Sequence, residues 1–278
     1  MPGMDCPRLL ATDLDGTLLR PDLSVSPRTV AALAAAEAAG VQVVFVTARP
    51  HRWLAPLAGL VGTHGTAICA NGASVVDVAT LTVVEQHGMP AELVAALVAR
   101  LRADLGPAVR FATEAADGFA RERRFVSDHP VPPGSPCVDR IEDALPAATL
   151  KLLVLDPDCG PPEEFTARVA ASVGDLATPS SSGADGLGEI AARGVTKART
   201  LAAWASARGI DAAAVWAVGD APNDLPMLHW AGRSFAVANA HPSVRAVVDE
   251  VLPSNADDGV ATLLERCTRT LHPTDPPV

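Results

Sequence analysis

Hydrophobic and polar positions alternate along the chain in blocks that predict strands and helices in turn. Residues 8–12 and 41–46 are short, continuous apolar runs of the kind that form buried strands. Between them, Ser26 and Pro27 precede an alanine-rich stretch that ends at Gly40. These residues are typical start and stop signals of a helix. Strand, helix and strand in this order predict a parallel sheet that is covered on both faces.

The same pattern continues to about residue 105 and returns after Gly194. The further elements that it predicts are a strand at 67–70, a hairpin at 75–76 and 81–84, helices at 90–105 and 196–208, a strand at 214–218, a short helix at 223–231, a strand at 234–237 and a last helix at 260–268. The proline-rich tail after Leu271 is expected to fray.

The middle of the chain has a different pattern, which predicts a small α+β domain with its own sheet. Its expected elements are strands at 109–113, 118–126 and 150–155, a loop at 130–136 and a helix at 162–172. We therefore expect an α/β protein with a Rossmann-like, doubly wound parallel sheet. Its core is formed by residues 1–86 and 192–278, and residues 87–191 form an inserted α+β domain.

Composition narrows the class of protein. The net charge of −10 argues against a nucleic-acid binder or a binder of anionic membranes, because both need a basic surface. Five cysteines are scattered without a CxxC pair, which favours free thiols in a reducing compartment. The apolar run at 9–11 is too short for a signal peptide, and no run approaches a membrane span of about 20 residues. We expect a cytoplasmic protein.

Polar residues follow the predicted core strands at the point where each strand ends. They are Asp13 and Asp15 after the first strand, Thr47, Ala48 and Arg49 after the second, Asn71 after the third, and Asp220, Asn223 and Asp224 after the late strand, with Lys197 opening the helix after the insert. Ligands of open parallel sheets bind at this edge. Four carboxylates there repel one another unless a cation sits between them, and oxygen-only donors suit Mg²⁺.

The same residues predict phosphoryl chemistry. Asp13 is placed to attack phosphorus, and an aspartyl-phosphate divides one difficult displacement into two easier ones. Asp15 lies two residues later and can act as general acid and then as general base. Lys197, Thr47 and backbone N–H groups are expected to hold the phosphate oxygens.

Four motifs resemble those of the haloacid dehalogenase (HAD) superfamily. Asp13-Leu-Asp15-Gly-Thr17 resembles its motif I, Thr47 its motif II, Lys197 its motif III, and the run from Gly219 to Leu228 its motif IV. Finer features resemble its Cof-type phosphatases with a C2-type cap, which are Asn71-Gly72, Glu189-Ile190, Asn239 and the run from Ser254 to Val260. Ala48 and Ala221 stand where this group usually has glycine.

The resemblance implies a set of roles. Mg²⁺ is expected on Asp13, the Asp15 backbone carbonyl, Asp220 and Asp224, the last directly or through water. Thr47 and Lys197 are expected to hold phosphate, Asn223 to orient the cluster, and Arg49 and Asn71 to face the substrate. The insert is expected to be a mobile cap that excludes water and sets specificity. Asp224 is also placed to cap its helix. Asn239 and Asn255 are expected to shape loops.

We therefore expect a Mg²⁺-dependent phosphatase that acts on a small phosphate ester, such as a sugar phosphate or a cofactor or nucleotide phosphate. Two alternatives are a phosphomutase-type phosphotransferase and a catalytically silent metabolite-binding protein. The basic run from Arg121 to Arg124 is either a solvated strand edge or a site for an anionic substrate tail.

Overall fold

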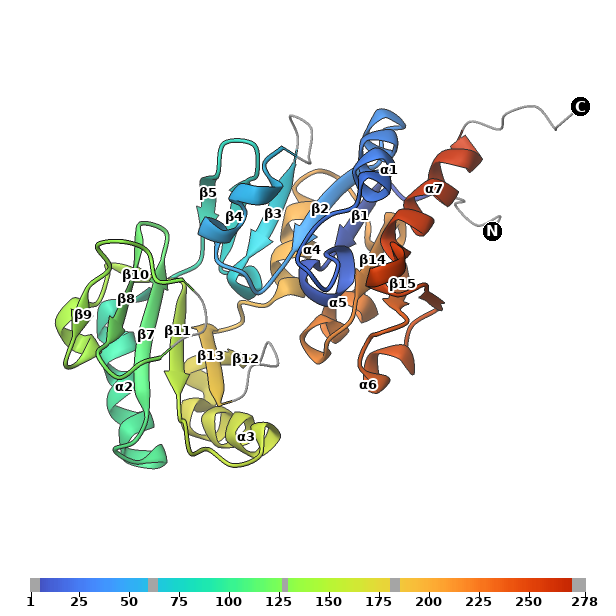
Figure 1. Ribbon diagram of the computed structural model, residues 1–278. Helices are drawn as coiled ribbons and strands as arrows, with labels where there is room; N and C mark the ends of the chain where they lie inside the picture. The colour runs from blue at the N-terminus through green and yellow to red at the C-terminus, as the bar shows by residue number, and fades with distance from the viewer. Residues whose placement is uncertain (1–5, 60–64, 127–129, 181–185, 272–278) are drawn as a thin grey trace, which may run out of the picture. The chain divides into compact units, whose positions relative to one another are not determined.

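The computed structural model describes residues 6–59, 65–126, 130–180 and 186–271, and the tail that was expected to fray lies outside them. The chain divides into two compact units (Figure 1). The core unit comprises Met1–Cys69, Val75–Thr82 and Lys197–Val278, and the insert unit comprises Ala70–Ser74 and Val83–Thr196.

A sheet with the strand order β16-β15-β14-β1-β2-β3-β4-β5 runs through the part of the core that the structure describes (Figure 1). The strands are β1 (Leu9–Thr12), β2 (Gln42–Val46), β3 (Thr66–Cys69), β4 (Ser74–Asp77), β5 (Thr82–Gln86), β14 (Val215–Gly219), β15 (Arg233–Val237) and β16 (Glu250–Leu252). β1 pairs in parallel with both β14 and β2, so the ends of these three strands meet at one edge.

Helices cover both faces of this sheet, since every residue of β1 and of β14 is buried. Helix α1 (Pro27–Ala38) packs with α7 (Gly259–Leu271), and α4 (Lys197–Ser206) packs with α5 (Leu225–Trp230). Helix α1 starts where the sequence predicts, because the Ser26 hydroxyl caps it by accepting a hydrogen bond from the Thr29 N–H at 3.0 Å. None of the helices described is both long and apolar enough to cross a bilayer.

The insert unit has its own sheet, in the order β12-β13-β11-β7-β8-β9 over the described residues. The strands are β7 (Arg110–Ala115), β8 (Gly118–Glu122), β9 (Cys137–Val138), β11 (Lys151–Leu155), β12 (Ala177–Ser180) and β13 (Leu187–Ala192). Two helices accompany it, α2 (Ala91–Leu105) and α3 (Pro162–Val173), and a short pair of strands lies apart, β6 (Met89–Pro90) with β10 (Ala148–Thr149).

Strand β11 shows how the insert sheet separates two apolar clusters. Leu152 and Val154 belong to the larger cluster, which contains Phe165 of α3. Leu153, which points the other way, packs against a smaller cluster that contains Phe119. This alternation follows from the two-residue period of a strand and gives the insert its own hydrophobic core.

The α/β class and the predicted elements of the core are confirmed, but the insert departs from prediction in two ways. The strand expected at 118–126 is too long, because the Phe125 N–H bonds back to the Glu122 carbonyl and closes a turn. Strands β12 and β13 were not predicted, and neither were the two-residue strands β6, β9 and β10. Pro179 interrupts the apolar pattern of β12, which tolerates proline because it is the edge strand of the sheet.

Candidate active site

A tight turn after β1 carries Asp13 and Asp15. The Asp13 N–H donates to the carbonyl of Val218 at 3.0 Å, which extends the pairing of β1 with β14 by one residue. Gly16 has a φ of +77°, and a Cβ at this position would overlap the carboxylate of Asp220. Glycine is therefore required both for the backbone conformation and for the close approach of the turn to Asp220.

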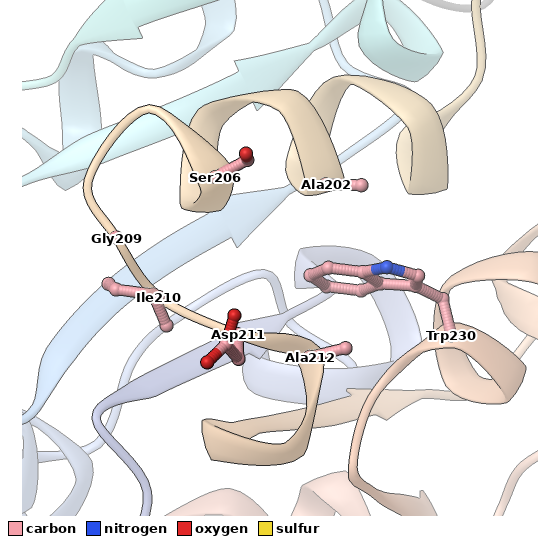
Figure 2. Close-up of a pocket in the computed structure, with 7 residues that line it drawn as sticks. All are labelled: Ala202, Ser206, Gly209, Ile210, Asp211, Ala212 and Trp230. Carbon is pink, nitrogen blue, oxygen red and sulfur yellow. The ribbon is translucent and has the colours of Figure 1, made fainter.

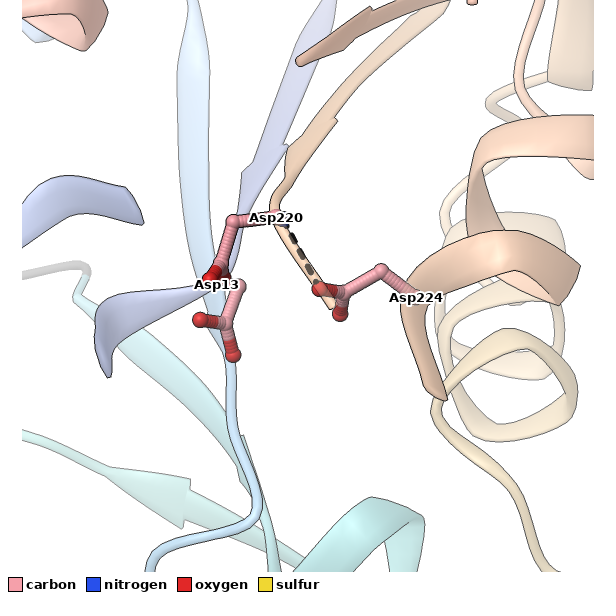
Figure 3. Close-up of side chains that lie close together, drawn as sticks. All are labelled: Asp13, Asp220 and Asp224. Carbon is pink, nitrogen blue, oxygen red and sulfur yellow. Dashed lines mark hydrogen bonds between the residues drawn. The ribbon is translucent and has the colours of Figure 1, made fainter. Parts of the chain in front are cut away.

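Three carboxylates meet at the carboxyl ends of β1 and β14 (Figure 3). Asp13, Asp220 and Asp224 each offer an oxygen, and these atoms lie within 4.8 Å of one another. Asp224 is fully buried and Asp13 is 5% exposed. Carboxylates that lie this close together and are shielded from water repel one another strongly. Positive charge is therefore needed to stabilise the arrangement.

Lys197 supplies one positive charge to these three carboxylates. Its Nζ lies 2.6 Å from Oδ1 of Asp13 and 2.8 Å from Oδ1 of Asp224. The lysine side chain is 3% exposed and is the first residue of α4. Residues far apart in sequence, 13, 197 and 224, are thus joined by a buried ion-pair network.

Burial and mutual repulsion shift the ionisation of these groups. Burial is the main cause that raises the pKa of Asp13, and the charges of Asp224 and Asp220 raise it further against the opposing effect of Lys197. Burial and then the charge of Asp224 raise the pKa of Asp220 to about 6. Burial disfavours the Lys197 ammonium, but the charges of Asp13 and Asp224 outweigh it and raise the lysine pKa above its ordinary value. The lysine therefore stays charged.

Asp224 stabilises the backbone at the end of β14 and also belongs to the carboxylate cluster. Its Oδ2 accepts hydrogen bonds from the backbone N–H groups of Asp220 and Ala221, each at 3.1 Å, while its Oδ1 binds Lys197. A Cβ on Gly219 would overlap the Asp224 side chain, so the end of β14 is shaped around it. The capping role that the sequence left open for Asp224 is present together with its position beside Lys197.

Thr17 also belongs to the site, although the sequence assigned it no role of its own. Its Oγ1 donates to Oδ1 of Asp220 at 2.9 Å, and its side chain is buried. This hydrogen bond favours the ionised form of Asp220 and opposes the rise in its pKa. Its position at the end of the DxDGT pentapeptide was the available signal.

The end of β2 places Thr47, Ala48 and Arg49 in one turn. The Thr47 N–H donates to the carbonyl of Ile68 at 2.8 Å, and its Oγ1 accepts the Arg49 N–H at 3.0 Å. The Arg49 guanidinium forms two hydrogen bonds with the carboxylate of Asp15, from Nε at 2.7 Å and from Nη2 at 2.6 Å. Arg49, expected to face a substrate, therefore pairs with Asp15 in this structure.

The two asparagines expected at the site lie in different units. Asn223 is in the short turn Pro222–Asp224 that leads into α5 in the core unit. Asn71 belongs to the insert unit, where its Nδ2 donates to Ser180 Oγ at 2.9 Å and to Glu189 Oε2 at 2.8 Å. Asn223 thus directly precedes Asp224 of the carboxylate cluster, whereas Asn71 is hydrogen-bonded to the insert's strands.

Asn239 and Asn255 hydrogen-bond to the turn after β1, which agrees with the loop-shaping role expected from the sequence. The Asn239 Nδ2 donates to the carbonyl of Gly16, and the Asn255 Nδ2 donates to the carbonyl of Leu19, both at 2.7 Å. The two residues are linked, because the Asn255 N–H donates to Oδ1 of Asn239 at 2.9 Å. They hold the loop that carries Asp15 from the side of the C-terminal segment.

A surface pocket of about 300 Å³ lies elsewhere in the core unit (Figure 2). It is lined by Ala202, Ser206, Gly209, Ile210, Asp211, Ala212 and Trp230. Residues 209–212 come before β14, whereas Asp220 follows the strand, so the pocket is at the opposite end of β14 from the carboxylates. Five residues of strand separate the two ends by roughly 16 Å.

Comparison with known proteins identifies the family. The model of the haloacid dehalogenase-like hydrolases matches residues 10–264. This span includes Asp13, Lys197, Asp220 and Asp224, which meet at the carboxylate cluster, and it also includes Thr47.

Relatives with assigned names and a solved structure agree with this result. A pyridoxal phosphate phosphatase of Escherichia coli (strain K12) is 28% identical over 276 residues, which cover 92% of this chain and 97% of the relative. A phosphoglycolate phosphatase of Methanopyrus kandleri is 27% identical over 259 residues, covering 93% and 96%. The structure of a HAD-superfamily phosphatase from Bacteroides thetaiotaomicron has the same fold, with a TM-score of 0.79, 23% identity and coverage of 96% and 97%.

Proposed function

The chain belongs to the haloacid dehalogenase-like hydrolases, and on this premise we propose that it is a Mg²⁺-dependent phosphatase of small phosphorylated metabolites. The observation that carries the proposal is the buried cluster of Asp13, Asp220 and Asp224 around Lys197. Three carboxylates and one ammonium leave an excess of negative charge in a site that has little contact with water. Such a site is suited to a divalent cation that is shared with an anionic substrate.

The residues present fit Mg²⁺. All the side-chain donors are carboxylate oxygens, which a hard cation prefers. Burial first, and then their mutual repulsion, raises the pKa values of Asp13 and Asp220. We propose Asp13, the backbone carbonyl of Asp15, Asp220 and Asp224 as the residues that hold the ion, Asp224 directly or through water. When bound, the ion would neutralise charge on the phosphoryl oxygens and favour attack by an anion.

Asp13 and Asp15 divide the chemistry. A carboxylate oxygen of Asp13 attacks phosphorus, the ester P–O bond breaks, and Asp15 gives its proton to the leaving oxygen. Water then attacks the phosphorus of the aspartyl-phosphate and gives a proton to Asp15, which releases phosphate and restores Asp13. Water is the acceptor in this scheme, so the net reaction is hydrolysis.

Four residues are proposed to hold the transferred group. Lys197 is charged and fixed, and its ammonium already lies 2.6 Å from the Asp13 carboxylate. The Thr47 Oγ1 accepts a bond from the Arg49 N–H, which leaves its hydroxyl hydrogen to donate to phosphate. The backbone N–H of Ala48 and the side chain of Asn223 complete the proposed set.

We propose that the insert unit determines which ester is cut. It contains the whole of the predicted domain 87–191, and it includes the basic run at 121–124. There Arg123 forms an exposed ion pair with Asp139 at 2.8 Å, and Arg121 donates to the carbonyl of Phe125. The named relatives act on pyridoxal phosphate and on phosphoglycolate, so the substrate class we propose is broad, namely small phosphate esters. A cytoplasmic location stays a prediction from the five scattered cysteines.

Phosphate release from a library of phosphorylated metabolites tests the function. We expect Mg²⁺-dependent release by the wild-type protein, loss of release with a chelator, and a loss of at least about 10³-fold for Asp13→Asn. Asp211→Asn is the matched control, because it removes a carboxylate at the other end of β14. Release at the wild-type rate by Asp13→Asn would show that the nucleophile is assigned wrongly.

The same library separates the two alternatives. A phosphotransferase would convert a hexose phosphate into an isomer without equivalent free phosphate. A silent binding protein would bind a phosphate ester tightly and turn over none of the library.

A further inference from the structure

We propose that Arg49 is a positioning residue for Asp15, which holds that carboxylate where it can exchange a proton with the leaving oxygen. The proposal rests on the phosphatase function above and deepens it. It assigns to Arg49 a role different from the substrate contact that its place in the sequence suggested.

The geometry of the pair is bidentate. Nε of Arg49 lies 2.7 Å from Oδ2 of Asp15, and Nη2 lies 2.6 Å from Oδ1. Two parallel N–H···O bonds between a planar guanidinium and a planar carboxylate fix distance and orientation together, which a single bond does not. The plane of the Asp15 carboxylate is therefore set by Arg49. Each carboxylate oxygen has a second lone pair beyond the one that accepts from Arg49, and this second site is where Asp15 can carry the proton that it exchanges.

Asp15 needs such a partner more than Asp13 does. Asp13 is buried and bonded to Lys197, whereas the side chain of Asp15 is 49% exposed. Among the described residues, the hydrogen bonds to the Asp15 carboxylate come from Arg49 alone. A half-exposed aspartate without a partner samples several rotamers, and proton transfer needs the donor and acceptor atoms within about 3 Å.

Arg49 itself is well anchored. Its side chain is 13% exposed, and its backbone N–H donates to Oγ1 of Thr47 at the end of β2. Strands β1 and β2 pair in parallel, with Thr12 opposite Phe45, so the turns that carry Asp15 and Arg49 leave adjacent strands. The ion pair therefore ties Asp15 to the rigid edge of the sheet.

Dependence on the leaving group separates positioning from direct substrate binding. An alkyl phosphate needs a proton on its leaving oxygen, whereas the p-nitrophenolate of p-nitrophenyl phosphate leaves readily without one. The parameter kcat/KM reports the steps up to loss of the leaving group and is independent of the later hydrolysis of the aspartyl-phosphate. A residue that acts through Asp15 affects kcat/KM for the alkyl ester, and a residue that binds phosphate affects both esters alike.

The experiment compares Arg49→Ala, Arg49→Lys and the control Arg52→Ala with the wild type. Arg52 lies on the same connection, and its guanidinium stands over the ring of Trp53 at 5.1 Å. Substrates are p-nitrophenyl phosphate and the two best alkyl phosphates of the metabolite library. For Arg49→Ala we expect kcat/KM to fall about 10- to 100-fold with both alkyl esters and less than about threefold with p-nitrophenyl phosphate. For Arg49→Lys we expect an intermediate loss of kcat/KM, because lysine keeps the positive charge but cannot form two parallel hydrogen bonds with the carboxylate.

Chemical rescue completes the test. Free guanidinium at millimolar concentration should restore alkyl ester turnover to Arg49→Ala and leave Arg52→Ala unchanged. Equal losses with alkyl and aryl esters, or a loss that guanidinium does not repair in a variant with a wild-type Tm, would overturn the proposal. Absence of turnover by the wild-type protein would instead refute the phosphatase function, so the two failures are distinguishable.

Discussion

The two ends of strand β14 differ in charge and in shape. At its carboxyl end, Asp220 joins Asp13 and Asp224 in a buried cluster (Figure 3). Before its amino end, Ala212 lines an open pocket of about 300 Å³ together with Trp230 (Figure 2). The pocket is lined by a single carboxylate, that of Asp211, whereas three carboxylates meet at the carboxyl end of the strand. Buried like charges, which cost free energy unless they serve a ligand, indicate the reactive end better than a hollow does.

Helix α4 connects the same two ends. It begins at Lys197, which is 3% exposed and bonded to two carboxylates, and it ends at Ser206, which lines the pocket. One helix therefore offers a matched pair of positions, one at each end. If function resides at the charged end, substitutions in α4 should differ sharply in effect according to their position.

The largest effect is expected from Lys197→Met, which keeps the length of the side chain and removes its charge. The cluster then loses the ammonium that faces Asp13 and Asp224, and we expect kcat/KM to fall about 10²- to 10³-fold. Ser206→Ala at the other end of α4 should keep wild-type kinetics. Addition of Mg²⁺ should still raise the Tm of Lys197→Met, because all three carboxylates remain. Equal losses in the two variants would remove the distinction between the ends.

The next effect concerns pH. The folded-state pKa of Asp220 is about 6, above its ordinary 3.8, so ionisation of Asp220 costs the metal-free protein stability as the pH rises between these values. Below pH 6 a proton therefore competes with Mg²⁺ for this carboxylate. We expect the Kd for Mg²⁺ to rise up to about tenfold for each pH unit below 6, measured by calorimetry. A Kd that is constant from pH 7 to 5 would contradict the assignment of Asp220 as a ligand.

A smaller effect is expected from Thr17→Val, which removes the hydrogen bond to Oδ1 of Asp220 and keeps the shape of the side chain. One bond to a charged group contributes about 1.5 kcal/mol or more, so we expect a loss of roughly tenfold in kcat/KM. Thr17→Ser keeps the hydroxyl and should retain most of the activity. If the serine variant is as impaired as the valine variant, packing rather than hydrogen bonding explains the effect.

The smallest effect is expected at the pocket. Trp230→Phe changes a lining residue and keeps an aromatic ring there. We expect kcat/KM for the library's best substrate to change less than about twofold, with a Tm shift of a few degrees at most. A larger loss of activity at unchanged Tm would show that the pocket influences the distant carboxylates.

The fold of the core could be predicted because its strands are continuous apolar runs and its helices have clear start and stop signals. Ser26 and Pro27 predicted the start of α1, and the apolar run before Gly219 predicted β14. Strand β13 was missed because Gly188 and Glu189 break its apolar pattern. Glu189 is nonetheless buried, where it forms an ion pair with Lys151 at 2.8 Å, and a pairing of this kind is invisible in a pattern of single residues.

The convergence of Asp13, Lys197 and Asp220 could also be predicted, because parallel strands end at one edge of the sheet. The pairing of Asp15 with Arg49 could not, since it depends on side-chain rotamers and on the exact path of two turns. Nor could the sequence show that Asn71 bonds to residues of the insert, because those strands were not predicted.

The chain returns from the insert directly into α4, whose first residue is Lys197. The helix is anchored in the core unit by its own buried residues, Leu201 and Trp204 among them. The position of the lysine is thus held by the helix that follows it. For protein engineering, this makes the insert an exchangeable cassette: a different α+β domain grafted ahead of Lys197 should leave the ion-pair network of the core in register.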